Sequence, residues 1–452
     1  MSRPTTARAE IATLARLAAP LAAANAGNQL MNVVDTAIVG RLTPRELGAV
    51  GLANAVFFVI TVVGLGIMMG FDPLIAQSFG ARDPARARRL LWQGVWLGIP
   101  VGLVLSVIVA FSPATLVPFG VDPDVARIAA SYIRLRIPGL LPMLTLFGLR
   151  AYLQAAGGRW ALVLATIVAN VSNLALGLLL VFGGRGLPWP LALVPAIGVR
   201  GAAINTVFST ILQLVVLAVA VRVIPSGGPV ARALVPGDIR RAFSVGLPIG
   251  LHLLAEVAVF SIVGILAGRL GAPELAAHQV TLTIASLSFM ISLGISTAGA
   301  VRVGYHVGAR DPENTRRAGL AAFAAGAAFM SLAALVFVTA GHPIARLMTD
   351  KAEVVAVTVP LLVVAAFFQI SDGTQAVGAG VLRGAGDTRF IFVANILGHY
   401  AIGLPVALIL GFHYHLGIQG LWWGLCAGLT AVAAALLVRF HSLSRRPIMP
   451  LH

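Results

Sequence analysis

The feature of this sequence that most limits its fold is a succession of apolar stretches long enough to cross a bilayer as helices. A bilayer core about 30 Å thick requires roughly 20 apolar residues per helical crossing. Hydrophobic residues make up 58% of the chain and charged residues only 11%, whereas soluble domains average roughly 25% charged residues. The sequence therefore predicts an all-α polytopic membrane protein with twelve transmembrane helices. They are expected near 12–39, 46–71, 90–111, 125–148, 160–182, 197–221, 243–268, 275–300, 318–340, 354–381, 390–411 and 417–439.

The net charge of +16 lies in short loops rather than on one helical or sheet face. Basic residues gather in alternate loops, whereas the loops between them mix both signs, as at 122–127 and 350–353. The positive-inside rule then places both termini in the cytoplasm, which requires an even number of crossings. Membrane orientation explains the charge, so we expect the lipid bilayer and no nucleic acid as a partner. The basic loops are 82–89, 232–241, 310–317 and 445–446.

An offset of 228 residues superimposes separate blocks of the chain on one another, which indicates an internal repeat. Six crossings per repeat keep both halves in the same orientation. We therefore predict two pseudo-symmetric six-helix lobes, residues 1–221 and 242–452, joined by a cytoplasmic linker at 222–241. The matching blocks are Pro20 with Pro248, 40–42 with 268–270, and 80–84 with 308–312.

Three carboxylates interrupt the apolar segments. Glu256 and Asp372 lie in the middle of theirs, where an ionised carboxylate facing lipid costs at least roughly 2.5 kcal/mol, so both are expected to face the protein interior. Asp35 lies nearer the outer end of the first segment, where partial solvation would lower that cost. A fourth acid, Asp72, is interpreted as solvated at a helix end.

Two interpretations of these buried acids remain open. They can fix helix packing by hydrogen bonding to neighbouring polar side chains, or they can bind a coupling ion or a substrate, as intramembrane ionisable residues usually do. A carboxylate that leaves water is stabilised by a proton or by a bound cation. Glu256 and Asp372 are therefore candidate Na⁺ ligands as well as proton-binding groups, and either use would let one gradient drive another.

Helical spacing adds neighbours to the two central acids. His252 lies four residues before Glu256 and Phe368 lies four before Asp372, so each pair shares a helix face. His252 either relays or tunes a proton or is satisfied by a backbone carbonyl.

Polar residues in the fifth and sixth segments are candidate partners of Asp35. Asn170 and Asn173 lie one turn apart in the fifth segment, and Thr206 lies in the sixth. Each either hydrogen bonds to Asp35 or joins two helices.

Two prolines at repeat-related positions are hinge candidates. Pro20 and Pro248 each remove a backbone hydrogen bond inside an apolar segment and permit bending there. Equivalent bends in both halves would suit a chain that changes conformation.

Signatures of soluble enzymes are missing from the sequence. There is no Walker-type phosphate-binding loop and no HExxH motif, and the histidines do not cluster with acids at metal-ligand spacing. The single cysteine, Cys426, has no partner for an internal disulfide and is interpreted as a packing residue. We therefore expect no cofactor and no ATP-driven transport by this chain. An integral-membrane enzyme with an acid pair is a remaining alternative, although no nucleophile accompanies the acids.

Several motifs together resemble the multidrug and toxic compound extrusion (MATE) family, especially its NorM-type bacterial members. The resemblance spans nearly the whole chain, and the motifs are specific as a set rather than singly. They are VDTAIVGRL at 34–42, GARDP at 80–84, LQAAG at 153–157, GLPIGLHLLAEVAVF at 246–260 and SDGTQAVGAGVLRGAGD at 371–387.

This resemblance implies an antiporter of cationic or amphiphilic drugs with two six-helix lobes. By position, Glu256 and Asp372 match the acids that bind the coupling cation in the carboxyl-terminal lobe. Asp35 matches the first-helix acid, and Asn173 and Thr206 match its polar neighbours.

Three positions depart from the family pattern. NorM-type proteins can place a tyrosine where this chain has Phe368, some archaeal relatives have an aspartate where it has Gly177, and His252 is not expected. The choice between H⁺ and Na⁺ therefore stays open.

The sequence thus predicts a monomeric, secondary active multidrug exporter in the inner membrane of a bacterium, working by alternating access. The main alternative is a flippase for a lipid-linked saccharide or peptidoglycan precursor. Such anionic substrates favour arginines in a cavity. The arginines that keep this alternative open are Arg134, Arg136, Arg150 and Arg383.

Overall fold

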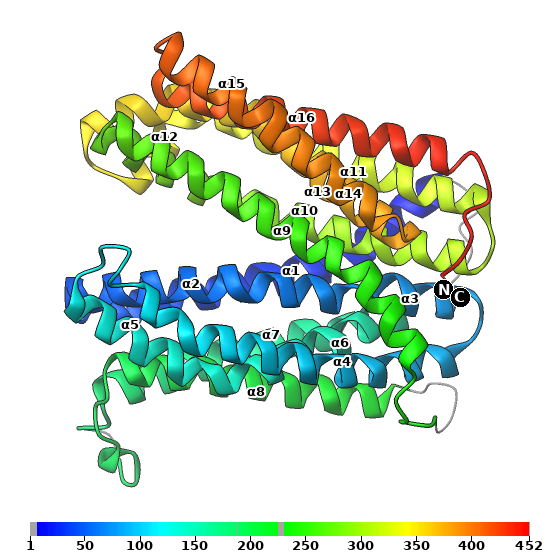
Figure 1. Cartoon of the computed structure of the whole chain (residues 1–452), viewed down its shortest axis with the longest axis horizontal. Helices are drawn as coiled ribbons and strands as arrows, with labels where there is room; N and C mark the ends of the chain where they lie inside the picture. The colour runs from blue at the N-terminus through cyan, green and yellow to red at the C-terminus, as the bar shows by residue number, and fades with distance from the viewer. Residues whose placement is uncertain (1–6, 187, 225–229, 452) are drawn as a thin grey trace. The chain divides into compact units, whose positions relative to one another are not determined.

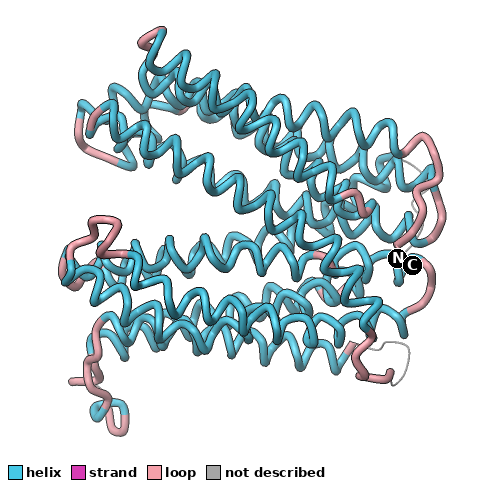
Figure 2. The backbone as a smooth tube through the Cα atoms, in the orientation of Figure 1, coloured by secondary structure: helices cyan, strands magenta, loops and turns pink. Residues whose placement is uncertain are grey.

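The computed structural model describes residues 7–186, 188–224 and 230–451 (Figure 1). Their regular structure is entirely helical, without any strand in this part of the chain (Figure 2). The predicted all-α class is confirmed. The helices are α1 (Ala7–Val39), α2 (Pro44–Met69), α3 (Phe71–Gly80), α4 (Pro84–Phe111), α5 (Pro123–Arg136), α6 (Leu140–Ala156), α7 (Arg159–Phe182), α8 (Val199–Val223), α9 (Pro236–Leu270), α10 (Ala272–Gly308), α11 (Pro312–Thr339), α12 (Gly341–Met348), α13 (Ala352–Ala385), α14 (Thr388–Ile396), α15 (Leu404–Leu408) and α16 (Gly417–Leu443).

Ten helical segments among the described residues are long and apolar enough to cross a membrane. They correspond to ten of the twelve predicted crossings. The other two predicted crossings are α1, which carries Asn25, Asn28, Asn32 and Asp35, and the α5–α6 segment. Polar and charged side chains lower the mean hydropathy of both segments.

The predicted crossing at 125–148 is not one continuous helix. Helix α5 ends at Arg136, a single 3₁₀ turn occupies Ile137–Gly139, and α6 begins at Leu140. Pro138 lies in this turn, where it cannot donate the hydrogen bond that an α-helix requires. The break leaves an arginine at the carboxyl end of a helix inside a membrane-spanning segment.

The chain divides into two compact units. Unit 1 comprises Met1–Asn25, Asp72–Arg82 and Leu251–His452, and unit 2 comprises Ala26–Phe71 and Asp83–Gly250. This division differs from the predicted lobes, because the first part of α1 groups with the carboxyl-terminal half and the first part of α9 groups with the amino-terminal half. The lobe boundaries at 221 and 242 stay a prediction, and residues 225–229 of the linker lie outside the described residues.

Close helix crossings explain this exchange of segments. In unit 2, α2 meets the first part of α9 at Gly66 and Gly250, where a methyl group on Gly66 would collide with the Gly250 backbone. In unit 1, α10 meets the first part of α1 at Gly294 and Ala22 in the same way. Small residues allow such backbone approach in membrane helices. The offset of 228 relates the two crossings, since Ala22 corresponds to Gly250 and Gly66 to Gly294.

The repeat is also present in the backbone of two loops. Asp83 and Asp311, 228 residues apart, cap α4 and α11. Each side chain accepts a hydrogen bond from the backbone N–H of the residue three positions later, Arg86 and Asn314 respectively. The residues before the two aspartates, Arg82 and Arg310, have φ angles of 60° and 54°. Positive φ is uncommon outside glycine. The shared conformation therefore shows that the matched GARDP motifs fold alike.

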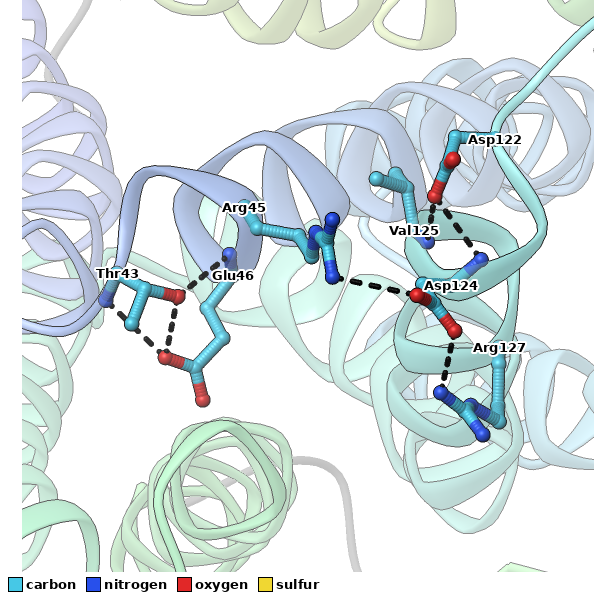
Figure 3. Close-up of polar contacts among 7 residues, drawn as sticks. All are labelled: Thr43, Arg45, Glu46, Asp122, Asp124, Val125 and Arg127. Atoms are coloured by element: carbon cyan, nitrogen blue, oxygen red, sulfur yellow. Dashed lines mark hydrogen bonds and ion pairs between the residues drawn. The ribbon is translucent and has the colours of Figure 1, made fainter.

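Capping residues hold the amino-terminal ends of α2 and α5 in unit 2 (Figure 3). Thr43 and Glu46 form a capping box at α2, in which each side chain accepts a hydrogen bond from the other residue's backbone N–H. Asp122 caps α5, and Arg45 of α2 contacts Asp124 of α5 at 3.2 Å. These contacts fix the two helix ends beside each other.

A buried ion pair ties the start of α1 into unit 1. Arg302 of α10 donates from Nε and from its terminal nitrogen to the two carboxylate oxygens of Glu10, at 2.8 and 2.6 Å. The side chains are 0% and 3% exposed. Glu10 lies close to the start of its helix, yet it is buried because α10 covers this turn of α1.

Candidate functional site

The first candidate site lies in unit 1 and contains both central acids. Glu256 comes from α9 and Asp372 from α13, and the charges of the two carboxylates act on each other. Asp372 is 5% exposed and the Glu256 side chain 15%. Gln375, one turn after Asp372, hydrogen bonds to Glu256. In the described part of the chain neither acid forms an ion pair with an arginine or lysine.

Two negative charges that act on each other in a poorly solvated interior repel each other. A bound proton or a monovalent cation removes that repulsion, so the arrangement suits exchangeable cation binding. The carboxylate oxygens and the Gln375 amide oxygen are the hard ligands that an ion such as Na⁺ takes. Within the described residues, no cluster of three or more His, Cys, Asp or Glu side chains is placed to hold a metal.

The two predicted neighbours of these acids differ in their roles. His252 Nε2 lies 3.8 Å from the Glu256 carboxylate, which is longer than a hydrogen bond. Phe368 is 2% exposed and packs in an aromatic cluster, with its ring centroid 6.0 Å from Phe260 and 5.1 Å from Trp422. Phe368 therefore supports the helix faces beside Asp372 and offers no oxygen to an ion.

The second candidate site lies in unit 2 and centres on Asp35 of α1. Asn173 of α7 donates to one carboxylate oxygen at 2.9 Å, and Thr206 of α8 donates to the other at 3.2 Å. Asp35 is only 8% exposed. The expectation that it is partly solvated is wrong, because α7 and α8 lie side by side (Figure 1) and present both donors to it.

The structure separates two asparagines that the sequence left equivalent. The Asn170 amide donates to the backbone carbonyls of Gly27 and Thr166, both at 2.9 Å, and so joins α7 to α1. Asn173 instead binds the Asp35 carboxylate, and Asn205 donates to the Asn173 carbonyl at 2.9 Å. Only the second asparagine belongs to the acid site.

This difference supplies a test of the Asp35 site. Replacing Asn173 with Ala removes one donor to a buried carboxylate, and hydrogen bonds to charged groups contribute about 1.5–3 kcal/mol. Under the antiport that the sequence motifs imply, we expect Asn173→Ala to weaken transport of a cationic drug by roughly tenfold in reconstituted vesicles. Asn170→Ala, one turn away, is the matched control and should keep transport within about twofold. Equal losses in both variants would remove the special role of Asn173.

The remaining predicted residues also have defined places. Pro20 and Pro248 lie inside α1 and α9, and both helices continue past them. The unit boundaries fall shortly afterwards, at Asn25 and Gly250. Cys426 is buried and contacts the Val364 carbonyl at 3.7 Å, which agrees with a packing role.

Several polar residues escaped sequence reasoning. Gln375 lies three residues after Asp372 on α13, and this spacing alone could have predicted that the two side chains share a helix face. Asp72, interpreted as solvated, is paired with Arg383 at 3.5 Å, with side chains 16% and 9% exposed. That interpretation is wrong because α13 of unit 1 places a buried arginine against α3, a pairing that no local pattern shows. Asn54 of α2 is a further such residue, and its amide oxygen accepts a hydrogen bond from Arg136 at 2.6 Å.

Together these observations define a class of protein. Two helical units each bury carboxylates inside membrane-spanning segments, and such residues mark ion or substrate pathways in membrane transporters. The internal repeat belongs to the same class, because many transporter folds are built from repeated halves.

The profile of the MatE family matches residues 20–179 and 248–409, and the chain therefore belongs to the MatE family. The two matches begin 228 residues apart (248 − 20 = 228), which agrees with the internal repeat. Members of this family are transporters rather than enzymes. The resemblance seen in the motifs is confirmed, and the alternative of an integral-membrane enzyme is removed.

Curated relatives match over almost the full length of the chain. "Multidrug resistance protein NorM" of Burkholderia vietnamiensis is 36% identical, with 94% of this chain and 93% of that protein aligned. "Probable multidrug resistance protein NorM" of Mesorhizobium japonicum is 34% identical, over 96% and 94% of the two chains.

Solved structures share the fold. The eukaryotic MATE transporter AtDTX14 has a TM-score of 0.85 at 23% identity, covering 97% of this chain and 98% of that one. A multidrug resistance MATE family transporter of the MOP superfamily in an outward-facing conformation has a TM-score of 0.86 at 21% identity, with 97% of both chains covered. These neighbours have the predicted twelve-helix fold. The chain is a multi-pass membrane protein, which in bacteria lies in the inner membrane.

Proposed function

We propose that this chain is a secondary active multidrug exporter that exchanges cationic or amphiphilic compounds for H⁺ or Na⁺ by alternating access. The NorM names of the relatives support multidrug efflux. The observation that carries the ion coupling is the pair Glu256 and Asp372, two carboxylates whose charges act on each other and that have no arginine or lysine partner among the described residues.

The coupling follows from competition for these acids. A proton or a Na⁺ ion neutralises the pair when it enters, and a cationic drug competes for the same negative charge. Gln375 holds Glu256 in place for either ion. His252 accepts or returns a proton through a small movement of its ring toward Glu256, which lies 3.8 Å away.

Conformational change is assigned to the two prolines. Pro20 and Pro248 remove backbone hydrogen bonds in α1 and α9, the two helices that the structure divides between the units. Bending at these prolines would let the acid site of a unit open to one side of the membrane and then to the other while its helices remain intact. The exporter works as a single chain with both termini in the cytoplasm.

The flippase alternative receives less support from the arginines that suggested it. Arg383 is already paired with Asp72, and Arg136 already donates to the Asn54 amide oxygen at 2.6 Å. An anionic lipid pyrophosphate would have to displace these partners. The two central acids of unit 1, in contrast, have no arginine or lysine partner among the described residues, which suits a cationic substrate.

Imposed gradients test the proposal directly. The full chain is reconstituted in proteoliposomes with a fluorescent cation such as ethidium, and a pH gradient and a Na⁺ gradient are applied separately. We expect at least one gradient to drive ethidium movement, and the effective gradient identifies the coupling ion. A tenfold ion gradient supplies about 1.4 kcal/mol per ion, so roughly tenfold accumulation is accessible to one-for-one exchange. An ethidium distribution that neither gradient changes would refute exchange.

A further inference from the structure

A half-buried arginine lies in unit 2 at a position that the transport proposal does not use. Arg136 is the last residue of α5, immediately before the 3₁₀ turn Ile137–Gly139. A cation is favoured there because the carboxyl end of a helix carries a partial negative charge. The break in the α5–α6 segment thus provides a reason for the sequence to place a guanidinium at this depth.

The surrounding side chains hold this guanidinium in a fixed position. Arg136 donates to the Asn54 amide oxygen at 2.6 Å and lies over the Phe57 ring, 4.2 Å from its centroid. The Tyr132 ring, one turn earlier in α5, lies 5.8 Å from the same guanidinium. A planar cation stacked on an aromatic face and bound to an amide has little freedom to leave.

A continuous polar chain connects this arginine to the acid of unit 2. The Tyr132 hydroxyl hydrogen bonds to Asn54 and to Thr206, and Thr206 donates to Asp35. The charge of Arg136 acts on the Asp35 carboxylate. Among the described residues, the charged and titratable groups that act on Asp35 are therefore Arg136 and Tyr132, and its remaining partner, Asn173, is neutral.

We propose that Arg136 is the built-in counter-charge of Asp35 and thereby determines how strongly unit 2 retains a cationic substrate. This inference rests on the proposed function. With Asp35 ionised, the two residues sum to zero charge, and a cationic drug must compete with a guanidinium that cannot leave. When Asp35 takes up a proton, the site carries one uncompensated positive charge and repels the drug. Arg136 thus converts protonation of Asp35 into release.

The acid sites of the two units therefore differ in net charge. Glu256 and Asp372 in unit 1 face no arginine or lysine partner in the described chain, so they attract cations strongly. In unit 2 the positive charge of Arg136 already neutralises the Asp35 carboxylate, so this site retains a cation only weakly. When Asp35 binds a proton, the net charge of the site becomes positive and the cation is repelled. Weak retention is useful in an exporter because a substrate held too tightly is not released.

Three variants of the full chain test whether Arg136 acts through its positive charge. Tetraphenylphosphonium and tetraphenylborate have the same shape and opposite charge, and binding of each to purified protein in detergent gives a ratio of affinities. We expect Arg136→Gln to raise the cation-to-anion ratio about tenfold, equivalent to about 1.4 kcal/mol. Asp35→Asn should lower the ratio, and Asp35→Asn combined with Arg136→Gln should return it near the wild-type value.

Matched controls separate charge from structural damage. Arg134, in the same last turn of α5 but exposed, is the control for loss of an arginine, and Arg134→Gln should leave the ratio unchanged. Arg136→Lys keeps the positive charge and should keep the ratio. If Arg136→Gln fails to fold, Arg136→Met removes the same charge with a side chain of similar length.

The outcomes distinguish this inference from the proposed function. A ratio in Arg136→Gln equal to those of wild type and Arg134→Gln overturns the inference and leaves gradient-driven export standing. Failure of the wild-type protein to move ethidium under either imposed gradient overturns the proposed function, and this inference falls with it.

Discussion

Replacing Glu256 with Gln, or Asp372 with Asn, is expected to reduce gradient-driven drug export by about 100-fold or more, equivalent to about 2.7 kcal/mol. Both substitutions keep the shape of the side chain and remove the charge that a proton or Na⁺ neutralises. The amides also cannot compete for a cationic drug. The measurement is ethidium transport by the full chain in proteoliposomes under an imposed pH or Na⁺ gradient.

Exposed acids of the same unit provide matched controls. Glu313→Gln changes an acid whose side chain is 71% exposed, and Asp350→Asn changes an acid in a loop. Both should export at nearly the wild-type rate. The neutral variants of the two central acids should remain folded in the membrane, because removing repelling charges does not strain the helices. Undiminished export by Glu256→Gln and Asp372→Asn would contradict the assignment of the pair.

Breaking the ion pair between Glu10 and Arg302 is expected to lower the free energy of unfolding by about 3–5 kcal/mol. Arg302→Leu leaves a carboxylate unpaired in the interior of unit 1, where both side chains are almost inaccessible. The two hydrogen bonds to the carboxylate are lost as well. Thermal or denaturant unfolding of the purified protein in detergent gives the measurement.

A second ion pair with exposed partners is the control for this loss. Arg317 pairs with Glu313 on α11, with side chains 44% and 71% exposed, and exposed pairs contribute only about 0–1 kcal/mol. Arg317→Leu should therefore unfold nearly as the wild type does. The double variant Glu10→Leu with Arg302→Leu should recover much of the stability, because no unpaired charge remains. An Arg302→Leu variant as stable as Arg317→Leu would show that the pair contributes little.

Much of the fold was accessible from local patterns in the chain. Apolar stretches of bilayer length indicate helices wherever they occur, and the offset of 228 residues revealed the repeat that appears in the paired turns at Arg82 and Arg310. The central acids Glu256 and Asp372 were recognisable because a charge in an apolar segment needs a partner or a function. These features depend on residues close together in sequence or on direct comparison of two segments.

The same repeat shows a limit of that approach. The offset places Val263 opposite Asp35 and Asn28 opposite Glu256, so the halves share a scaffold but not their acids. Symmetry alone therefore does not say what surrounds each acid.

The sequence by itself determined the helical membrane class, the repeat and the candidate acids. Only the tertiary structure decided that Asn173 rather than Asn170 binds Asp35, that Arg136 is linked to Asp35, and that Glu10 is buried against Arg302. Each of these contacts joins residues dozens to hundreds of positions apart. The physical reason is that such pairs depend on how each helix is rotated about its axis and on which helix it crosses, and close glycine crossings such as that of Gly66 with Gly250 set both.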